Sequence, residues 1–310
     1  MTDSRYTPRV RRVLIILAFI VVVLAGAAAG FVAWHTSRAA ATAPPAGKKA
    51  PQAIVYKVGL SRAHGVRPAP KQAYGHPILF RYPLVQDGDK GPAVRRLQEL
   101  LANYGYLPVR FTATETRPLP TTPRPGQFTW KFTAPPVLGA MWEPGMFGTM
   151  TRGAVMTFQA NNGMPTDGVA GAQVWEALLG KHPARNPVPY TYAVVHETLP
   201  ESISIYREGT SVFTSPANTG IPQAPTAQGT FPVYLRYTST TMSGTNPDGS
   251  HYSDPGVPWV SYFNGGDAVH GFLRGSYGSP QSLGCVELPY STAQGAYDLM
   301  NYGTLVTVTS

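Results

Sequence analysis

The stretch from His270 to Leu288 reads HGFLRGSYGSPQSLGCVEL and contains Cys285, the single cysteine of the 310 residues. A lone cysteine cannot form an internal disulfide, so its use is more often chemical than structural. Gly284 lets the backbone approach a substrate closely, and His270 on a neighbouring strand could supply the base that activates a thiol. The competing interpretation is a small buried hydrophobic side chain in a glycine-rich turn.

Three further motifs precede this stretch. They are the strand-and-turn run 202–209, the pair Thr219-Gly220, and the segment 225–231, which reads PTAQGTF. In this order, and together with the His-Gly and Ser-Leu-Gly-Cys motifs, they resemble the L,D-transpeptidase catalytic domain (YkuD type) of bacterial cell walls. The resemblance covers residues 189–310. Several motifs in the right order make the match specific.

The resemblance implies a peptidoglycan L,D-transpeptidase with Cys285 as nucleophile and His270 as base. The thiolate would attack the carbonyl of the third residue of a donor stem peptide, expel the terminal D-alanine and leave a thioester. An amine of a neighbouring stem would then take the acyl group and form a 3→3 cross-link. No cofactor or metal is implied. The implied partners are peptidoglycan stem peptides and glycan, and carbapenem-type β-lactams are expected to inhibit covalently.

Other residues are expected to shape the site. Backbone amides near Gly284 and Cys285 would hold the oxyanion, a contribution typically worth several kcal/mol. A backbone carbonyl in the turn from Ser282 to Gly284 would orient the imidazole. Tyr252 lies where some relatives carry a tyrosine hydroxyl near the oxyanion, and an ordinary loop tyrosine is the equal alternative. Asp254 and Asp267 are expected to be solvated loop acids.

Two positions depart from the family pattern. Leu283 stands where the family has a histidine, and Glu287 stands where it has arginine or asparagine. We expect altered substrate contacts there, with Arg274 compensating the charge of Glu287. Two other functions stay open, namely an L,D-carboxypeptidase that gives the acyl group to water, and a non-catalytic peptidoglycan-binding scaffold.

The N-terminus predicts where the protein acts. Residues 13–34 form an uncharged, strongly apolar run of 22 residues, enough for a helix to cross a membrane. The arginines of the basic tail 1–12 favour a cytoplasmic N-terminus, so a linker (35–82) and everything after it would be extracytoplasmic. We therefore expect a single-pass signal-anchor in a bacterial cell membrane. A signal peptide cleaved near the small residues 25–30 is the alternative.

Charge and histidine content add little. The formal charge of +9 suits anionic wall polymers or phospholipid headgroups, but four arginines of the basic tail contribute much of it. No basic helix or aromatic–basic interleaving indicates nucleic acid. The histidines outside the motif region are scattered, and no second cysteine exists to build a zinc site.

Residues 83–182 predict a second, helical domain. A pattern of acid or proline followed by Gly-x-x-Gly occurs three times, each time before a helical run, at 87–91, 144–148 and 167–171. These runs predict three short helices around a small core. The turn and core residues of the three runs resemble the peptidoglycan-binding domain 1 family. The insertion 108–143 is far longer than the family's usual link. Its run 128–132 alternates as a strand or hairpin does, and it would cover a glycan-facing groove or pack on the catalytic domain.

The catalytic domain is predicted to be a mostly-β sandwich with one helix. Short β-branched or aromatic runs separated by turn residues predict strands at 192–195, 202–206, 212–213, 231–237, 259–263 and 305–308. The helix is predicted from Thr292 to Asn301, with a capping box at 291–294 and Gly303 just past its end. The fold class is therefore multidomain α and β: a transmembrane helix, a three-helix domain with a long insertion, and this sandwich.

Overall fold

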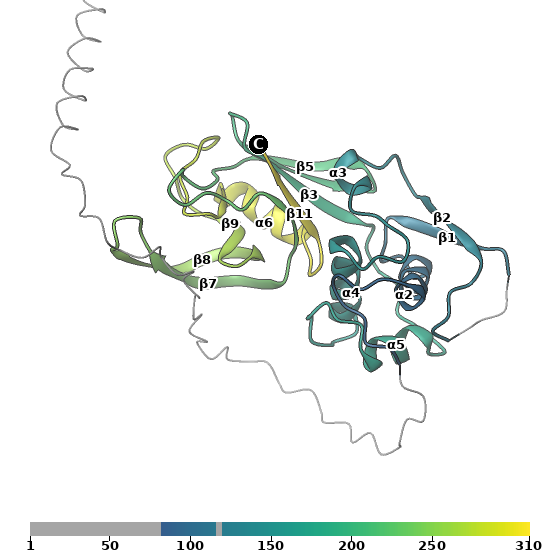
Figure 1. Ribbon diagram of the computed structural model, residues 1–310. Coiled ribbons are helices and arrows are strands. Elements are labelled where there is room, and N and C mark those ends of the chain that lie inside the picture. The colour runs from purple at the N-terminus through teal and green to yellow at the C-terminus, as the bar shows by residue number, and fades with distance from the viewer. Residues whose placement is uncertain (1–81, 116–119) are drawn as a thin grey trace, which may run out of the picture. The chain divides into compact units, whose positions relative to one another are not determined.

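The computed structural model describes residues 82–115 and 120–310 (Figure 1). The basic tail, the predicted membrane span 13–34 and nearly all of the linker 35–82 lie outside the described residues. Within the described ranges, no helix has both the length and the apolar character needed to cross a membrane.

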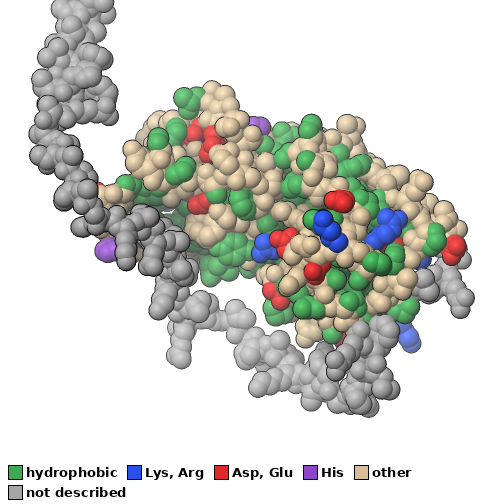
Figure 2. All heavy atoms as spheres, in the orientation of Figure 1, with side chains coloured by type: hydrophobic (Ala, Val, Ile, Leu, Met, Phe, Trp, Pro, Cys, Tyr) green, Lys and Arg blue, Asp and Glu red, His purple; other side chains and the backbone are tan. Residues whose placement is uncertain are grey.

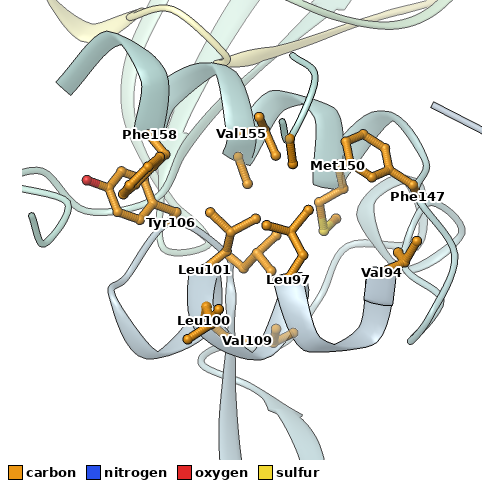
Figure 3. Packing of buried hydrophobic residues seen from close by; sticks show 14 of the residues in the cluster. Val94, Leu97, Leu100, Leu101, Tyr106, Val109, Phe147, Met150, Val155 and Phe158 are labelled. Carbon is orange, nitrogen blue, oxygen red and sulfur yellow. The ribbon is translucent and has the colours of Figure 1, made fainter. Parts of the chain in front are cut away.

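Three helices form the core of the N-terminal domain, as predicted. They are α2 (Pro92–Asn103), α4 (Thr149–Asn161) and α5 (Ala172–Leu179), and the short α3 (Pro136–Gly139) lies in the insertion. Leu97 and Leu101 of α2 point toward Val155 of α4 (Figure 3). The rings of Tyr106 and Phe158 form a T-shaped pair whose centroids lie 5.2 Å apart. The three- and four-residue spacing of these apolar side chains puts them on one face of each helix, which explains the core.

The insertion forms a β-hairpin, as its alternating pattern predicted. Strands β1 (Val109–Ala113) and β2 (Gly126–Trp130) pair antiparallel. The hairpin is tied to α2, because Arg95 donates to the Gly126 carbonyl at 2.8 Å and lies 5.2 Å above the Phe128 ring. Beyond β2, the Phe132 ring packs on Gly209, where an added Cβ would lie 2.8 Å from it. Phe132 therefore packs on the C-terminal domain, one of the two positions expected for the insertion.

Two sheets make up the C-terminal domain (Figure 1). One has the order β5-β4-β3-β11-β6, and the other has the order β10-β9-β8-β7. Their bounds are β3 Thr191–His196, β4 Ser202–Arg207, β5 Thr210–Pro216, β6 Gly229–Pro232, β7 Leu235–Thr245, β8 His251–Asn264, β9 Asp267–Gly271, β10 Val286–Leu288 and β11 Leu305–Thr309. Buried residues of both sheets, among them Ile205, Val269 and Val306, share one core with α6 (Tyr290–Leu299), which confirms the sandwich.

The predicted strand 231–237 proves to be two strands in different sheets. β6 ends at Pro232, and the N–H of Val233 turns to the carbonyl of Thr304 at 2.9 Å, so the chain crosses from one sheet to the other. The predicted strand 259–263 is the end of the much longer β8, which pairs with β7 as a hairpin. Strands β9 and β10 were not predicted, because each is short and lies among glycine-rich turns.

The predicted helix 292–301 begins two residues earlier, and its capping box is wrong. Pro289 is the N-cap of α6, with φ −53° and no side-chain cap. The Thr292 hydroxyl bonds the Pro289 carbonyl at 3.1 Å and the Ser215 hydroxyl at 2.8 Å instead of capping. A proline, whose φ is fixed close to the helical value, replaces the predicted serine cap.

The two domains meet backbone to backbone at two glycines. A Cβ added to Gly303, in the turn before β11, would lie 2.1 Å from the Gly153 carbonyl of α4. Beside it, the Thr157 hydroxyl donates to the Tyr302 carbonyl at 2.9 Å. Tyr192 and Leu305 of the sandwich also belong to the hydrophobic core of the helical domain. The helices are therefore packed directly on the sheet that carries β11.

The face drawn in Figure 2 shows basic and acidic side chains side by side, without a large patch of one sign.

Candidate active site

Strands β9 and β10 bring the predicted nucleophile and base to one face of a sheet. They pair in parallel, with His270 opposite Glu287 and Val269 opposite Val286. Because side chains alternate along a strand, the two valines enter the sandwich core while His270 and Glu287 point the other way. Cys285 immediately precedes β10 and packs with Ala268 on that second face. The pairing of β9 with β10 thus brings His270 and Cys285, which are 15 positions apart in the sequence, to the same face of the sheet.

His270 is held in one orientation by a backbone carbonyl. Its side chain is buried, with 3% of the residue exposed, and Nδ1 lies 3.1 Å from the carbonyl oxygen of Gly271. With its proton on Nδ1, the ring leaves Nε2 unprotonated and able to accept one. The prediction that a carbonyl of the 282–284 turn orients the ring is wrong, since the Gly271 carbonyl does so.

Burial lowers the pKa of His270 below its usual value, although the Gly271 bond and the charge of Glu287 oppose this shift. A buried imidazolium loses its hydration, so the neutral ring is favoured. Burial likewise raises the pKa of the Cys285 thiol to about 12; the Ala268 N–H opposes this shift, and the charges of Asp267 and Glu287 add to it. Both shifts favour the uncharged forms of the resting pair, a neutral thiol and a neutral imidazole.

The turn before the cysteine is shaped by Ser282. Its hydroxyl donates to the Cys285 carbonyl at 2.6 Å and accepts the Gly284 N–H at 3.2 Å. The Gly284 N–H is thus bonded within the turn. Of the two backbone amides predicted to hold the oxyanion, the Cys285 N–H is therefore the remaining candidate. Gly284 has φ 112°, and a Cβ there would lie 2.5 Å from Oδ1 of Asp267. Only glycine fits this position without strain.

A buried acid that the sequence analysis missed braces the same turn. Glu201 is 2% exposed and accepts both the N–H and the hydroxyl of Thr219 at 2.7 Å. The Thr219 carbonyl in turn accepts the N–H groups of Gln281 and Ser282 at 2.9 Å. The Thr219-Gly220 motif therefore fixes, through these hydrogen bonds, the backbone of the turn that precedes Cys285. An isolated acid beside a proline gave no signal of this role.

Asp267 is not the solvated acid that was expected. Its Oδ2 accepts the N–H of Ala227 at 3.1 Å, and Oδ1 lies against Gly284. Burial raises the pKa of this carboxyl group, and hydrogen bonds from Ala227 and Asn264 oppose that shift. The side chain is partly buried because the tight β8–β9 turn places it against the loop that carries Cys285. Asp267 thus joins the 225–228 loop to the turn that carries Cys285.

Replacing Asp267 by Asn should make the thiol more acidic. The amide oxygen still accepts the Ala227 N–H, but the negative charge beside the sulfur is gone. We expect iodoacetamide to alkylate Cys285 about threefold to tenfold faster at pH 9. The control is Asp248→Asn, an exposed acid at the hairpin tip, which should leave the alkylation rate unchanged. An unchanged or slower rate in Asp267→Asn would contradict this role.

The charge of Glu287 is compensated by Arg274, as predicted. Glu287 is 4% exposed, and Nε and Nη2 of Arg274 each lie 2.7 Å from one of its carboxylate oxygens. The structure thus pairs a buried carboxylate in bidentate geometry, which is the condition for burying it at all. Leu283, the other departure from the family pattern, is half-buried in the turn.

A tyrosine of the β7–β8 hairpin other than the predicted Tyr252 packs in the cluster that contains Cys285. Tyr252 packs across β7, where a Cβ on Gly244 would lie 2.8 Å from its hydroxyl. Tyr262 lies in one cluster with Cys285. Burial raises the pKa of Tyr262 to about 12, with the charge of Cys285 next in effect. Side chains alternate between the two faces of β8, so the sequence predicts which tyrosines share a face. It does not predict which of the two faces lies next to Cys285.

In the described part of the chain, no group of three or more His, Cys, Asp or Glu side chains is arranged to hold a metal ion.

Comparisons with known proteins agree with this architecture. Residues 191–308 match the family model of the L,D-transpeptidase catalytic domain, and residues 140–178 match that of a putative peptidoglycan binding domain. No curated protein matches the chain.

Solved structures of L,D-transpeptidases are also similar. An Enterococcus faecium L,D-transpeptidase is 25% identical, with a TM-score of 0.36, over 42% of this chain and 54% of that one. The catalytic domain from E. faecium is 27% identical, with a TM-score of 0.36, over 38% and 96%. A Mycobacterium smegmatis L,D-transpeptidase is 21% identical, with a TM-score of 0.38, over 46% and 65%. The chain thus spans 54% and 65% of the two longer ones. Residues 191–308 of this chain form a domain of the L,D-transpeptidase catalytic family, accompanied by a domain of the putative peptidoglycan-binding type.

Proposed function

We propose that this protein is a peptidoglycan L,D-transpeptidase that forms 3→3 cross-links through a thioester on Cys285. The observation that carries the proposal is the placement of His270 on β9 and of Cys285 immediately before the adjacent β10, on one face of the sheet, within a domain that matches this family. The Gly271 carbonyl supports it further, because it leaves Nε2 of His270 as a proton acceptor.

In the acylation half, the thiol loses its proton as it attacks, because both groups are neutral at rest. The sulfur bonds to the carbonyl carbon of the third residue of the donor stem, and Nε2 of His270 takes the thiol proton. The Cys285 N–H stabilises the oxyanion of the tetrahedral intermediate. The C–N bond then breaks, the imidazolium gives its proton to the departing D-alanine amine, and a thioester remains.

In the second half, the amine of an acceptor stem attacks the thioester. His270 takes a proton from this amine, and the sulfur leaves and is reprotonated, so the free thiol returns. If water attacks instead, the same site acts as an L,D-carboxypeptidase. A non-catalytic scaffold is the remaining alternative, and it predicts no acylation of Cys285 at all.

We also propose that residues 13–34 anchor the chain in the bacterial cell membrane, with the basic tail in the cytoplasm. The helical domain would then bind peptidoglycan outside the cell, which its match to a putative peptidoglycan binding domain supports. The +9 charge is consistent with an anionic wall.

Two measurements on the full chain test this function. Mass spectrometry after incubation with a carbapenem should find one adduct of the intact drug, on the peptide that contains Cys285. Chromatography of products from disaccharide-tetrapeptide muropeptides should show 3→3 dimers. Trimmed tripeptides without dimers would favour the carboxypeptidase, and an unmodified protein with unchanged muropeptides would favour the scaffold.

A further inference from the structure

In the described part of the chain, Arg274 forms its hydrogen bonds through Nε and Nη2 of the guanidinium group. Nε and Nη2 bind the two oxygens of Glu287 at 2.7 Å, and Nη2 also donates to the Gln281 carbonyl at 3.2 Å. The partner carboxylate is almost fully buried, so water does not compete for it. The guanidinium is therefore fixed in direction by two parallel charge-assisted bonds.

The other edge of the guanidinium faces outward. Nη1 takes part in none of these bonds, and it is not among the buried polar atoms that lack a partner in the described ranges. The Arg274 side chain is 31% exposed, whereas that of Glu287 is 5% exposed. The positive end of the ion pair is thus the end that solvent or a ligand can reach.

Arg274 packs in the same layer of side chains as His270. Glu287 lies directly opposite His270 in the β9–β10 ladder and two residues after Cys285. The Phe272 ring meets the His270 ring edge-on at 5.8 Å, and the Arg274 guanidinium lies 4.8 Å above the same Phe272 ring. Imidazole, aromatic ring and guanidinium therefore form one continuous layer.

We propose that Arg274 determines substrate specificity by binding, through Nη1, the free α-carboxylate at the end of the donor stem peptide. This inference rests on the proposed function, since it names the group that the same site recognises. In a tetrapeptide stem that carboxylate is one residue beyond the attacked carbonyl, about 4 Å in Cα spacing. The two residues from Cys285 to Glu287 span about 7 Å of strand. A guanidinium seated over Glu287 is therefore within reach of the carboxylate when the carbonyl lies at the sulfur.

A carboxylate fits this position better than other groups do. Nη1 of a guanidinium donates charge-assisted hydrogen bonds to a carboxylate oxygen, and the packing of Phe272 and Glu287 against the rest of the group strengthens that interaction. A stem extended by one more residue would place a neutral peptide bond there instead. The site would then prefer stems that end one residue after the scissile bond.

The test measures binding rather than turnover, in the full chain with Cys285→Ser so that no thioester forms on the cysteine. Calorimetry compares a tetrapeptide stem as the free acid with the same stem as the C-terminal amide. We expect the free acid to bind about tenfold or more tightly. In Arg274→Gln/Glu287→Gln, which leaves no unpaired buried charge, the two stems should bind equally. The control Arg110→Gln, on the exposed face of β1, should keep the full difference.

The outcomes separate this inference from the proposed function. Equal binding of acid and amide by the Cys285→Ser chain, or a preference that survives in the double variant, would overturn the role of Arg274. A preference that Arg274→Lys retains in full would also overturn it, because a lysine keeps the charge but has no separate Nη1 group beyond the bonds to Glu287. If Cys285 is not acylated in the wild-type protein, the proposed enzymatic function is wrong. The ratio of the affinities for the free-acid and amide stems would still show whether the protein recognises the carboxylate. Thermal unfolding of each variant identifies any that has lost its fold.

Discussion

Replacing Cys285 by serine should abolish acylation by a carbapenem and lower the rate of muropeptide cross-linking by about 10⁴-fold or more. The thiol is the only side chain at the site that can become a strong nucleophile after giving up a proton to His270. A serine hydroxyl has a much higher pKa and the same neutral imidazole beside it, so it gains little nucleophilicity. The fold should survive, because the substitution removes little volume from a half-buried position.

Intact-protein mass spectrometry and single-turnover kinetics measure this effect. Circular dichroism and the unfolding temperature serve as the control for folding. A Cys285→Ser protein that still carries the drug, or still forms dimers at more than a small fraction of the wild-type rate, would place the nucleophile elsewhere.

Replacing His270 by glutamine should slow acylation of Cys285 by about 10²- to 10⁴-fold, the usual contribution of a general base. Glutamine can still donate to the Gly271 carbonyl, so it preserves the hydrogen bond at 3.1 Å while removing the proton acceptor. The loss should be smaller at high pH, where hydroxide produces the thiolate directly. Stopped-flow acylation between pH 6 and 10 measures it, and His251→Gln, an exposed histidine of the hairpin, is the matched control.

The same substitution should change how stability depends on pH. His270 has a lowered pKa in the folded protein, so below about pH 6.5 the unfolded chain takes up a proton that the folded chain does not. The wild type should therefore lose stability as the pH falls through that range. His270→Gln should lose less, as measured by urea unfolding at pH 7.5 and 5.5. An equal loss in both proteins would show that the imidazole is already charged in the folded state.

Alkaline pH should destabilise the wild type by the opposite route. The pKa of the Cys285 thiol is raised to about 12 in the folded protein, from an ordinary value of 9.0. Above pH 9 the thiol therefore loses its proton in the unfolded chain but not in the folded one, which lowers the free energy of unfolding. The neutral resting pair follows from burial of both groups. Neither the cysteine nor the histidine motif reveals such burial in the sequence.

Local patterns determined much of this protein. The spacing of Val94, Leu97 and Leu101 predicts α2, because helical periodicity is encoded within a dozen residues. The uniqueness of Cys285, the glycine before it and the His270-Gly271 pair, together with the resemblance to the L,D-transpeptidase catalytic domain, predict which residues form the candidate site. These signals need no information about distant contacts.

Tertiary structure alone decided what surrounds the sulfur. β9 and β10 are too short and too rich in neighbouring glycines to be predicted, yet their parallel pairing places His270 opposite Glu287. Asp267 is partly buried because the 225–228 loop and Gly284 lie against it. The pairing of Arg274 with Glu287 was predicted, but its bidentate geometry and the burial of Glu287 depend on where this loop and strand meet. Burial and charge pairing are properties of segments that meet in space, so one segment's sequence cannot determine them.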